Sequence, residues 1–201
     1  MSAEDAHAAN QRFHAHSFPA ALGMAHSHEF RDVRHLLDVA GGSGCYSIAL
    51  ALRHHHLRCT VADLPVVASD ARSYVERYDC QSRVDTYGFN MFSDEWPTGY
   101  DGVLFSNVLH DWDPDRCEHL VRSAFATLQP GGRLFIHEML LNDSQDGPLP
   151  ASLFSVMMLG TRGKQFSFAE LDDQVRKVGF VDTDVRHTYG YYSIVVARKG
   201  T

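Results

Sequence analysis

Short runs of apolar residues alternate along the chain with longer stretches in which apolar residues recur every three or four positions. The short runs are rich in β-branched and aromatic side chains, which favours strands. We expect five of them, at His35–Val39, Leu57–Ala62, Arg83–Tyr87, Gly102–Ser106 and Leu134–Glu138. The longer stretches have helical spacing, and we expect helices at Tyr46–Arg53, Val66–Tyr78, Pro114–Leu128 and Phe168–Val178. Strands that alternate with helices predict a parallel sheet with helices on both faces.

The two ends of the chain depart from this alternation. Phe180–His187 and Tyr191–Arg198 indicate two strands joined by a tight turn at Tyr189-Gly190, which is an antiparallel hairpin. The first residues have loose helical spacing, and we expect a break at Pro19 because proline has no N–H to donate. We therefore predict a helical segment over residues 1–30. Residues 31–201 should form one α/β domain, a Rossmann-like, doubly wound, mostly parallel seven-stranded sheet with a C-terminal antiparallel hairpin.

Composition and charge argue against several classes of function. The formal net charge is -7 and the basic residues are scattered, which argues against a nucleic-acid partner. No apolar run approaches the roughly 20 residues that span a bilayer, so we expect no membrane partner. The 4 cysteines form no C-x-x-C pair and no secretory signal precedes them. We therefore expect reduced thiols in a cytoplasmic protein.

A glycine-rich turn follows the first predicted strand and opens a helix. Gly41, Gly42 and Gly44 allow the backbone to approach a ligand closely. Asp63 ends the next strand, where a carboxylate can accept hydrogen bonds from ribose hydroxyls. Asp38 precedes the glycines, and an acidic residue there suits a cofactor with a positive centre better than a pyrophosphate. The alternative is that Asp38 only bonds or caps the loop.

His110 is the candidate general base. It lies just past the strand Gly102–Ser106, at the edge where ligands bind in open α/β sheets. A histidine is largely unprotonated at neutral pH and can take the proton of a phenol. The alternative is a loop residue ahead of Asp113, which we expect to cap the helix that starts at Pro114.

Seven segments in this order resemble the plant caffeic-acid and animal acetylserotonin (hydroxyindole) O-methyltransferase family. They are Leu37–Gly44, Asp63–Pro65, Asn90–Phe92, His110–Trp112, Gln129–Arg133, His137–Leu141 and Thr161–Ser167. Together they cover nearly the whole chain at family spacing. The resemblance implies a class I S-adenosylmethionine-dependent methyltransferase.

The resemblance also implies particular cofactor contacts. With Asp38 and Gly44 of the loop, they are Gly41, Gly42, Asp63, Leu64, Asn90, Met91 and Ser106. Asp63 would hold the ribose and Met91 would pack on the adenine. Asn90 stands where the family usually has an aspartate, and Ser106 where it has a basic residue.

For catalysis, the resemblance implies that Glu138 orients His110. A second acidic residue of the family is Gln165 here, which lacks the charge that stabilises an imidazolium. Substrate-lining residues would be His16, Phe154, Met157 and Met158. The alternative for the phenylalanine and the methionines is ordinary core packing.

We therefore expect methyl transfer to a hydroxyl of a small aromatic, phenol-like substrate. A first alternative is C-methylation of an activated carbon, as in an α-keto acid, helped by a metal held by His14, His16, His110 or His137, although no spacing here specifies a metal site. A second alternative is a non-catalytic cofactor-binding domain.

The family's N-terminal dimerisation domain has no counterpart in this sequence, which would make the chain a shortened form, a fragment or a naturally short homologue. Residues 1–30 would then be a remnant of the connection to that domain. We expect Phe13, Phe18, Met24 and the pair Met157-Met158 to lose cover and form an exposed apolar patch, with the first 25 or so residues mobile or repacked. Any homodimer would form through this N-terminal segment.

Overall fold

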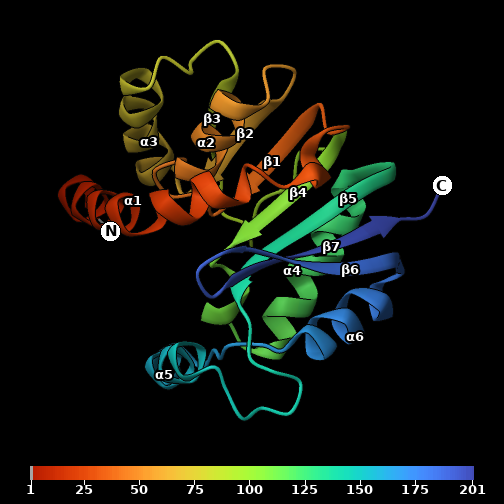
Figure 1. Ribbon diagram of the computed structural model, residues 1–201. Helices are drawn as coiled ribbons and strands as arrows, with labels where there is room; N and C mark the ends of the chain where they lie inside the picture. The colour runs from red at the N-terminus through yellow and green to blue at the C-terminus, as the bar shows by residue number, and fades with distance from the viewer. Residues whose placement is uncertain (1) are drawn as a thin grey trace.

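The computed structural model describes residues 2–201 and has a seven-stranded sheet at its centre (Figure 1). The strand order is β3-β2-β1-β4-β5-β7-β6. The strands are β1 His35–Val39, β2 Arg58–Asp63, β3 Val84–Gly88, β4 Tyr100–Ser106, β5 Leu128–Met139, β6 Phe180–Tyr189 and β7 Tyr192–Lys199. The first five pair in parallel and β7 runs antiparallel to both β5 and β6. The predicted mostly parallel sheet with a terminal hairpin is confirmed.

Helices cover both faces of the sheet (Figure 1). They are α1 Ala3–Met24, α2 Cys45–Arg53, α3 Pro65–Arg77, α4 Pro114–Thr127, α5 Leu149–Met158 and α6 Phe168–Val178, with short 3-10 helices at His28–Phe30, Leu109–Asp111 and Leu159–Thr161. The first three helices pack on one face and bury Met24, Ile48 and Tyr74 there. On the other face α4 and α6 bury Leu120 and Val175. The two cores hold the sheet between them.

Capping residues fix where α4 and α6 begin. Asp113 accepts a hydrogen bond from the backbone N–H of Arg116 at the start of α4, as predicted. Ser167 forms a reciprocal capping box with Glu170 at the start of α6, and Gly179 ends that helix with a φ of 115°. These caps satisfy backbone groups that the helices leave unpaired at their ends. As a result, the loop before each helix has a defined position beside the sheet edge.

Helix α1 is continuous through Pro19, so the predicted break there is wrong. Proline leaves the carbonyl of Ala15 without its helical partner, but Ala15 is exposed and its carbonyl can bond to water. The residues after the proline are held by packing, because Ala20, Ala21 and Met24 are buried. Tertiary packing therefore outweighs the local cost of the proline.

The expected apolar patch is only partly present. Phe13 and Met157 are exposed by 67% and 68%, whereas Met24 is fully buried in the core that α1 shares with the sheet, so its predicted exposure is wrong. The first helix is packed rather than loose, since it contacts α2, α3 and β6. Within residues 2–201 no helix is both long and apolar enough to cross a membrane.

Candidate functional site

The sheet reverses its strand order between β1 and β4, which lie side by side. The loop after β1 leads to α2 and the chain after β4 leads to α4, which cover opposite faces of the sheet. Open α/β sheets typically bind ligands in the crevice at such a point. Gly42 and Gly44 have φ values of 56° and 74°, in the left-handed region that favours glycine. A Cβ on Gly41 would lie 2.9 Å from Val61 Cγ1, so that position also requires glycine.

Asp63 organises this loop from the end of β2. Its Oδ2 accepts from the backbone N–H of Gly42 at 2.9 Å and its Oδ1 from that of Leu64 at 2.7 Å. Burial raises the pKa of Asp63 and these two hydrogen bonds oppose the rise. Each carboxylate oxygen keeps a free lone pair, and the residue stays partly exposed at the sheet edge. The carboxylate is therefore able to accept hydrogen bonds from a ligand.

Asp38 lies beneath the loop rather than at its surface. The residue is only 1% exposed, and its Oδ2 accepts from the Ser47 hydroxyl at 2.7 Å. Burial raises its pKa to about 7, with the Ser47 hydrogen bond opposing and the charge of Asp63 adding to the rise. A Cβ added to Gly41 would lie only 3.0 Å from Asp38 Oδ2. In this position Asp38 supports the loop from below.

The other predicted cofactor residues lie at the same edge. Asn90 follows β3, and its Oδ1 accepts from the N–H of Phe92 at 3.0 Å. The carbonyl of Met91 accepts from Trp96 Nε1 at 2.9 Å, so this loop is held in place. Ser106 ends β4. Side chains of Asn90, Met91 and Ser106 are all partly exposed, as residues that line a site would be.

His110 and Glu138 form a buried pair, as predicted. The histidine lies on the 3-10 helix after β4, and its Nδ1 is 2.7 Å from Glu138 Oε2 at the end of β5. Glu138 Oε1 accepts from the backbone N–H of Val108 at 3.1 Å, so both carboxylate oxygens are bound. In the neutral ring the pair fixes the proton on Nδ1 and leaves Nε2 as the unprotonated nitrogen, 3.6 Å from Asp111 Oδ1.

The electrostatics of His110 favour its protonated form. Burial alone would lower its pKa, but the charge and hydrogen bond of Glu138, with a smaller effect of Asp111, raise it above the ordinary value. Asp111 has its own pKa raised by burial, against the opposing charge of His110. The imidazole is therefore a stronger base than a free histidine.

Gln165 reaches the same imidazole from the loop before α6. Its Nε2 is 3.3 Å from His110 Nδ1, while its Oε1 is buried without a hydrogen-bond partner. His110 Nδ1 carries a proton that it donates in the hydrogen bond to Glu138. It therefore cannot also accept a hydrogen bond from the Gln165 amide N–H. Gly163 of the same loop lies against the His110 carbonyl, where a Cβ would overlap the oxygen. The loop thus packs directly against the segment that carries His110.

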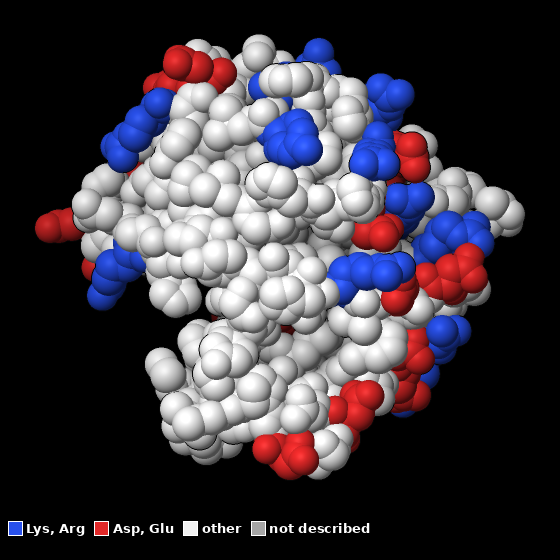
Figure 2. Space-filling model, viewed as in Figure 1, with Lys and Arg blue, Asp and Glu red and all other residues white. Residues whose placement is uncertain are grey.

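The four predicted substrate residues are distributed over two helices. Phe154 of α5 lies edge-on to His110 with ring centroids 5.6 Å apart. Met157 and the partly exposed Met158 follow on α5, and His16 is exposed on α1. Figure 2 shows a hollow between α1 and α5 whose walls carry few charged side chains.

Two residues of α1 touch the glycine loop and were missed in the sequence. Asn10 Oδ1 lies 3.5 Å from where a Cβ of Gly42 would be, and its Nδ2 donates to Asp70 at 2.8 Å. The His14 ring bonds to Ser43 Oγ at 2.9 Å through Nδ1. No sequence motif predicts these two contacts, because they depend on α1 lying across the glycine loop.

The residues considered for a metal do not gather. His14 bonds to Ser43, His110 to Glu138 and His137 to Ser106, three separate places. Among residues 2–201 no group of three metal-ligating side chains is present. The metal-assisted alternative therefore loses the observation that motivated it.

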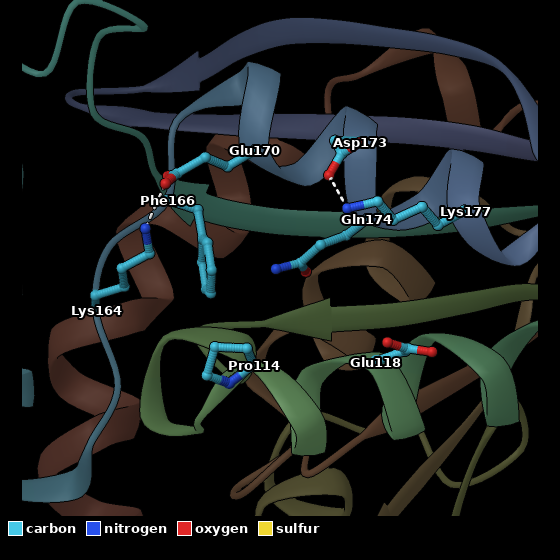
Figure 3. Close-up of a pocket in the computed structure, with 8 residues that line it drawn as sticks. All are labelled: Pro114, Glu118, Lys164, Phe166, Glu170, Asp173, Gln174 and Lys177. Carbon is cyan, nitrogen blue, oxygen red and sulfur yellow. Dashed lines mark hydrogen bonds and ion pairs between the residues drawn. The ribbon is translucent and has the colours of Figure 1, made fainter.

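A separate cavity of about 260 Å³ lies between α4 and α6 (Figure 3). Its charged side chains are largely paired with one another, since Lys164 bonds to Glu170 and Lys177 to Asp173. None of the predicted site residues lines it. It is distinct from the crevice at the sheet edge.

The fold and the residues at this edge define a Rossmann-like methyltransferase domain. The chain belongs to the O-methyltransferase domain family, which matches residues 7–181. The members of this family are class I S-adenosylmethionine-dependent methyltransferases, which confirms the resemblance seen in the sequence.

Individual relatives show the range of the family. The chain is 38% identical to 3-hydroxy-5-methyl-1-naphthoate 3-O-methyltransferase of Streptomyces sahachiroi, over 79% of this chain and 46% of that protein. It is 34% identical to L-tyrosine C(3)-methyltransferase of Streptomyces lavendulae, over 72% and 40%. The structure of human N-acetylserotonin methyltransferase in complex with SAM matches with a TM-score of 0.88 and 26% identity, over 100% of this chain and 57% of that one. The chain thus spans about half the length of the curated relatives it matches.

Proposed function

We propose that this chain binds S-adenosylmethionine in the crevice between β1 and β4 and directs its methyl group to the hydroxyl of a small aromatic substrate. The carrying observation is the buried His110–Glu138 pair, whose neutral imidazole has an unprotonated Nε2 at the same end of the parallel strands as the glycine loop. The cofactor, when bound, supplies an electrophilic methyl group on its sulfonium. The protein then has to align the acceptor and remove its proton.

The residues at the crevice fit this cofactor. The carboxylate of Asp63 has free lone pairs for the two ribose hydroxyls, and Leu64 and Met91 offer partly exposed apolar side chains for the adenine. Asn90 Oδ1 accepts from the N–H of Phe92 and keeps a second lone pair that can accept from the adenine amine. The left-handed backbone at Gly42 and Gly44 shapes the loop that would receive the amino-acid end of the cofactor. Asp38 supports the loop from beneath, where its Oδ2 accepts from the Ser47 hydroxyl.

His110 acts as general base in this proposal. Glu138 holds Nδ1–H, which keeps Nε2 free to take the phenol proton and stabilises the imidazolium that forms. Phe154 covers one side of the imidazole, and we propose that His16, Met157 and Met158 line the entry to the substrate site. Deprotonation leaves a phenolate oxygen as the nucleophile.

The relative named for tyrosine C(3)-methylation supports a second outcome of the same chemistry. A phenolate carries negative charge on the ring carbons beside its oxygen as well as on the oxygen. The same base can therefore prepare either atom, and substrate orientation decides which one receives the methyl group. The position of the methyl group in the product distinguishes the two reactions.

We further propose that residues 1–30 act as a helical segment that joins this catalytic domain, over residues 31–201, to whatever covers the substrate side. The exposed Phe13 on α1 supports self-association through this segment. The four cysteines are all free and buried, which supports a cytoplasmic setting. Light scattering tests self-association, because a strictly monomeric protein would contradict it.

The central experiment is calorimetric titration with S-adenosylhomocysteine, followed by methylation of a panel of naphthols, indoles and simple phenols with mass detection. We expect cofactor binding and methylation of at least one phenol. Cofactor binding without any methylation would support a non-catalytic binding domain instead. Failure to bind the cofactor would contradict the proposed function altogether.

Asp63→Ala tests the cofactor site by itself. Losing a charge-assisted pair of hydrogen bonds should weaken binding by about 1.5–3 kcal/mol, or roughly tenfold to a hundredfold. Asp85→Ala is the matched control, since Asp85 is an exposed carboxylate on the neighbouring strand β3. Equal affinities in both variants would remove Asp63 from the site.

A further inference from the structure

A second histidine, His137, lies on β5 beside Glu138 but on the opposite face of the strand. It is fully buried. The ring of Tyr192 stacks on it at 5.0 Å with 9° between the planes, and the ring of Tyr46 meets it edge-on at 5.3 Å. The imidazole is therefore held in one orientation.

Both ring nitrogens of His137 are bonded to hydroxyl groups. Nε2 is 2.9 Å from Thr188 Oγ1 of β6, and Nδ1 is 3.1 Å from Ser106 Oγ of β4. A hydroxyl can donate or accept, so these distances alone do not give the direction of either bond. A third contact decides it.

Thr188 Oγ1 lies 3.1 Å from the backbone carbonyl of Tyr192. A carbonyl can only accept, so the single hydroxyl hydrogen of Thr188 is used there. Thr188 must then accept from His137, which places the proton of the neutral ring on Nε2. Burial lowers the pKa of His137 to about 3, so the ring is neutral at physiological pH. Nδ1 is consequently a bare acceptor.

The direction of the last bond follows. The Ser106 hydroxyl donates its only hydrogen to His137 Nδ1, so its oxygen can act only as an acceptor, both toward the neighbouring Tyr46 hydroxyl and toward the crevice. Ser106 is partly exposed at the end of β4, next to the glycine loop after β1. A group that meets this oxygen from the crevice must be a hydrogen-bond donor. The amino-acid end of the cofactor has one such group, its α-ammonium, while its carboxylate can only accept.

We propose that His137 is a positioning residue that fixes Ser106 as a hydrogen-bond acceptor for the α-ammonium group of the cofactor. This inference rests on the proposed function for the identity of the ligand. The chain from the Tyr192 carbonyl through Thr188 and His137 to Ser106 stands on the protein's own contacts. In this proposal Ser106 contacts the ammonium group of the cofactor rather than its carboxylate.

The first test needs no ligand. Protein labelled with ¹⁵N in histidine is studied by NMR, and the His137 signals are assigned by their loss in His137→Gln. We expect a neutral ring protonated on Nε2, with Nδ1 unprotonated and no titration between pH 5 and 8. A proton on Nδ1 would overturn the proposal whether or not the protein binds a cofactor.

The second test measures calorimetric affinities for S-adenosylhomocysteine and for two analogues, one without the α-amino group and one without the carboxylate. His137→Phe and Ser106→Ala should weaken the parent compound and the analogue without the carboxylate about tenfold or more. Neither variant should change the affinity for the analogue without the amino group. His137→Gln, which keeps a donor and an acceptor, should retain more affinity than His137→Phe.

Thr188→Val provides a variant outside the crevice, since it removes only the group that holds Nε2–H. It should weaken binding of S-adenosylhomocysteine and of the analogue without the carboxylate, but by less than His137→Phe does. His187→Phe is the matched control, because His187 is an exposed histidine next to Thr188 on β6 and bonds only to the Gly190 carbonyl. Thermal unfolding confirms that each variant is folded.

The pattern of losses separates the possible failures. If the variants weaken the analogue without the amino group as much as the others, or spare the analogue without the carboxylate, Ser106 does not accept from the ammonium and the proposal is overturned. If wild-type protein binds none of the three ligands, the proposed function fails, and the NMR result still decides the direction of the hydrogen bonds.

Discussion

The two faces at the end of β5 treat a buried histidine in opposite ways. On one face His110 is 4% exposed and its pKa is raised, and on the other His137 is 0% exposed and its pKa falls to about 3. Burial is nearly equal, so the difference comes from the partners. Glu138 supplies a charge to His110, whereas His137 meets only neutral hydroxyls and aromatic rings.

The lesson is that burial alone does not decide whether a histidine can accept a proton. Desolvation disfavours the imidazolium on both faces, and a carboxylate at 2.7 Å reverses that on one of them. In the proposed function, one face therefore provides a base, and the other provides a neutral hydrogen-bond relay. Alternation along β5 places the two functions back to back.

Removing the base should have the largest effect. His110→Ala should lower turnover on the best phenol about a hundredfold or more, because general base catalysis is lost. Affinity for S-adenosylhomocysteine should stay within about twofold, since no cofactor contact is removed. His119→Ala, an exposed histidine on α4, is the control. Steady-state kinetics with calorimetry decides the point, and equal turnover would assign His110 to loop structure.

Replacing the partner carboxylate should have the next largest effect. In Glu138→Gln one amide end must face the N–H of Val108 and the other must face His110. If the oxygen bonds Val108, the amide N–H meets Nδ1 and drives the histidine proton to Nε2, which blocks the base. We expect turnover to fall about tenfold or more.

The pH profile gives a second readout of the same variant. Because Glu138 raises the pKa of His110, the variant should show its rise in kcat at a lower pH than wild type. Glu118→Gln, on the exposed surface of α4, should leave the profile in place. An unchanged profile in Glu138→Gln would separate Glu138 from His110.

The two histidines should also give stability opposite pH dependences. The folded pKa of His110 is raised, so its contribution is present below the unfolded value of about 6.5 and is lost as pH rises through the folded value. The folded pKa of His137 is lowered, so stability falls as pH drops from about 6.5 toward about 3.

Urea unfolding at pH 7.5 and pH 5.0 measures this effect. Because of His137, the free energy of unfolding of wild type should fall by up to about 1.4 kcal/mol for each pH unit below 6.5. His137→Gln should lose less stability than wild type over that interval, although its absolute stability at pH 7.5 is lower. An identical loss in both proteins would mean that His137 is protonated in the native state.

Most of the fold follows from the sequence because alternating patterns report burial directly. The five parallel strands, the hairpin and the cap at Asp113 were all predicted. Helix α5 was missed because it packs against little of the protein: Leu149, Leu153 and Val156 are all more than half exposed. A helix without a buried face leaves no periodic signal.

The site residues also differ in whether a local sequence pattern could predict them. Residues in short motifs, such as the glycine loop with Asp63, could be found from local chemistry. His110 and Glu138 are 28 residues apart, and only the resemblance brought them together before the sheet did. The relay through His137 depends on Thr188 and Tyr192, which the antiparallel register of β7 on β5 brings to it. No local pattern contains that register.

The smallest expected effect concerns Gln165, which touches His110 without a clear hydrogen bond. In Gln165→Glu a second carboxylate would share the Nδ1 proton with Glu138 and further raise the pKa of His110. Two buried carboxylates around one proton repel each other, which limits the gain. We expect turnover to change less than tenfold, with the rise in kcat shifted to higher pH. Gln165→Met is the control, because it keeps the length of the side chain without a polar atom. A profile that stays in place in Gln165→Glu would show that residue 165 does not act on the imidazole, and that Glu138 alone separates the chemistry of His110 from that of His137.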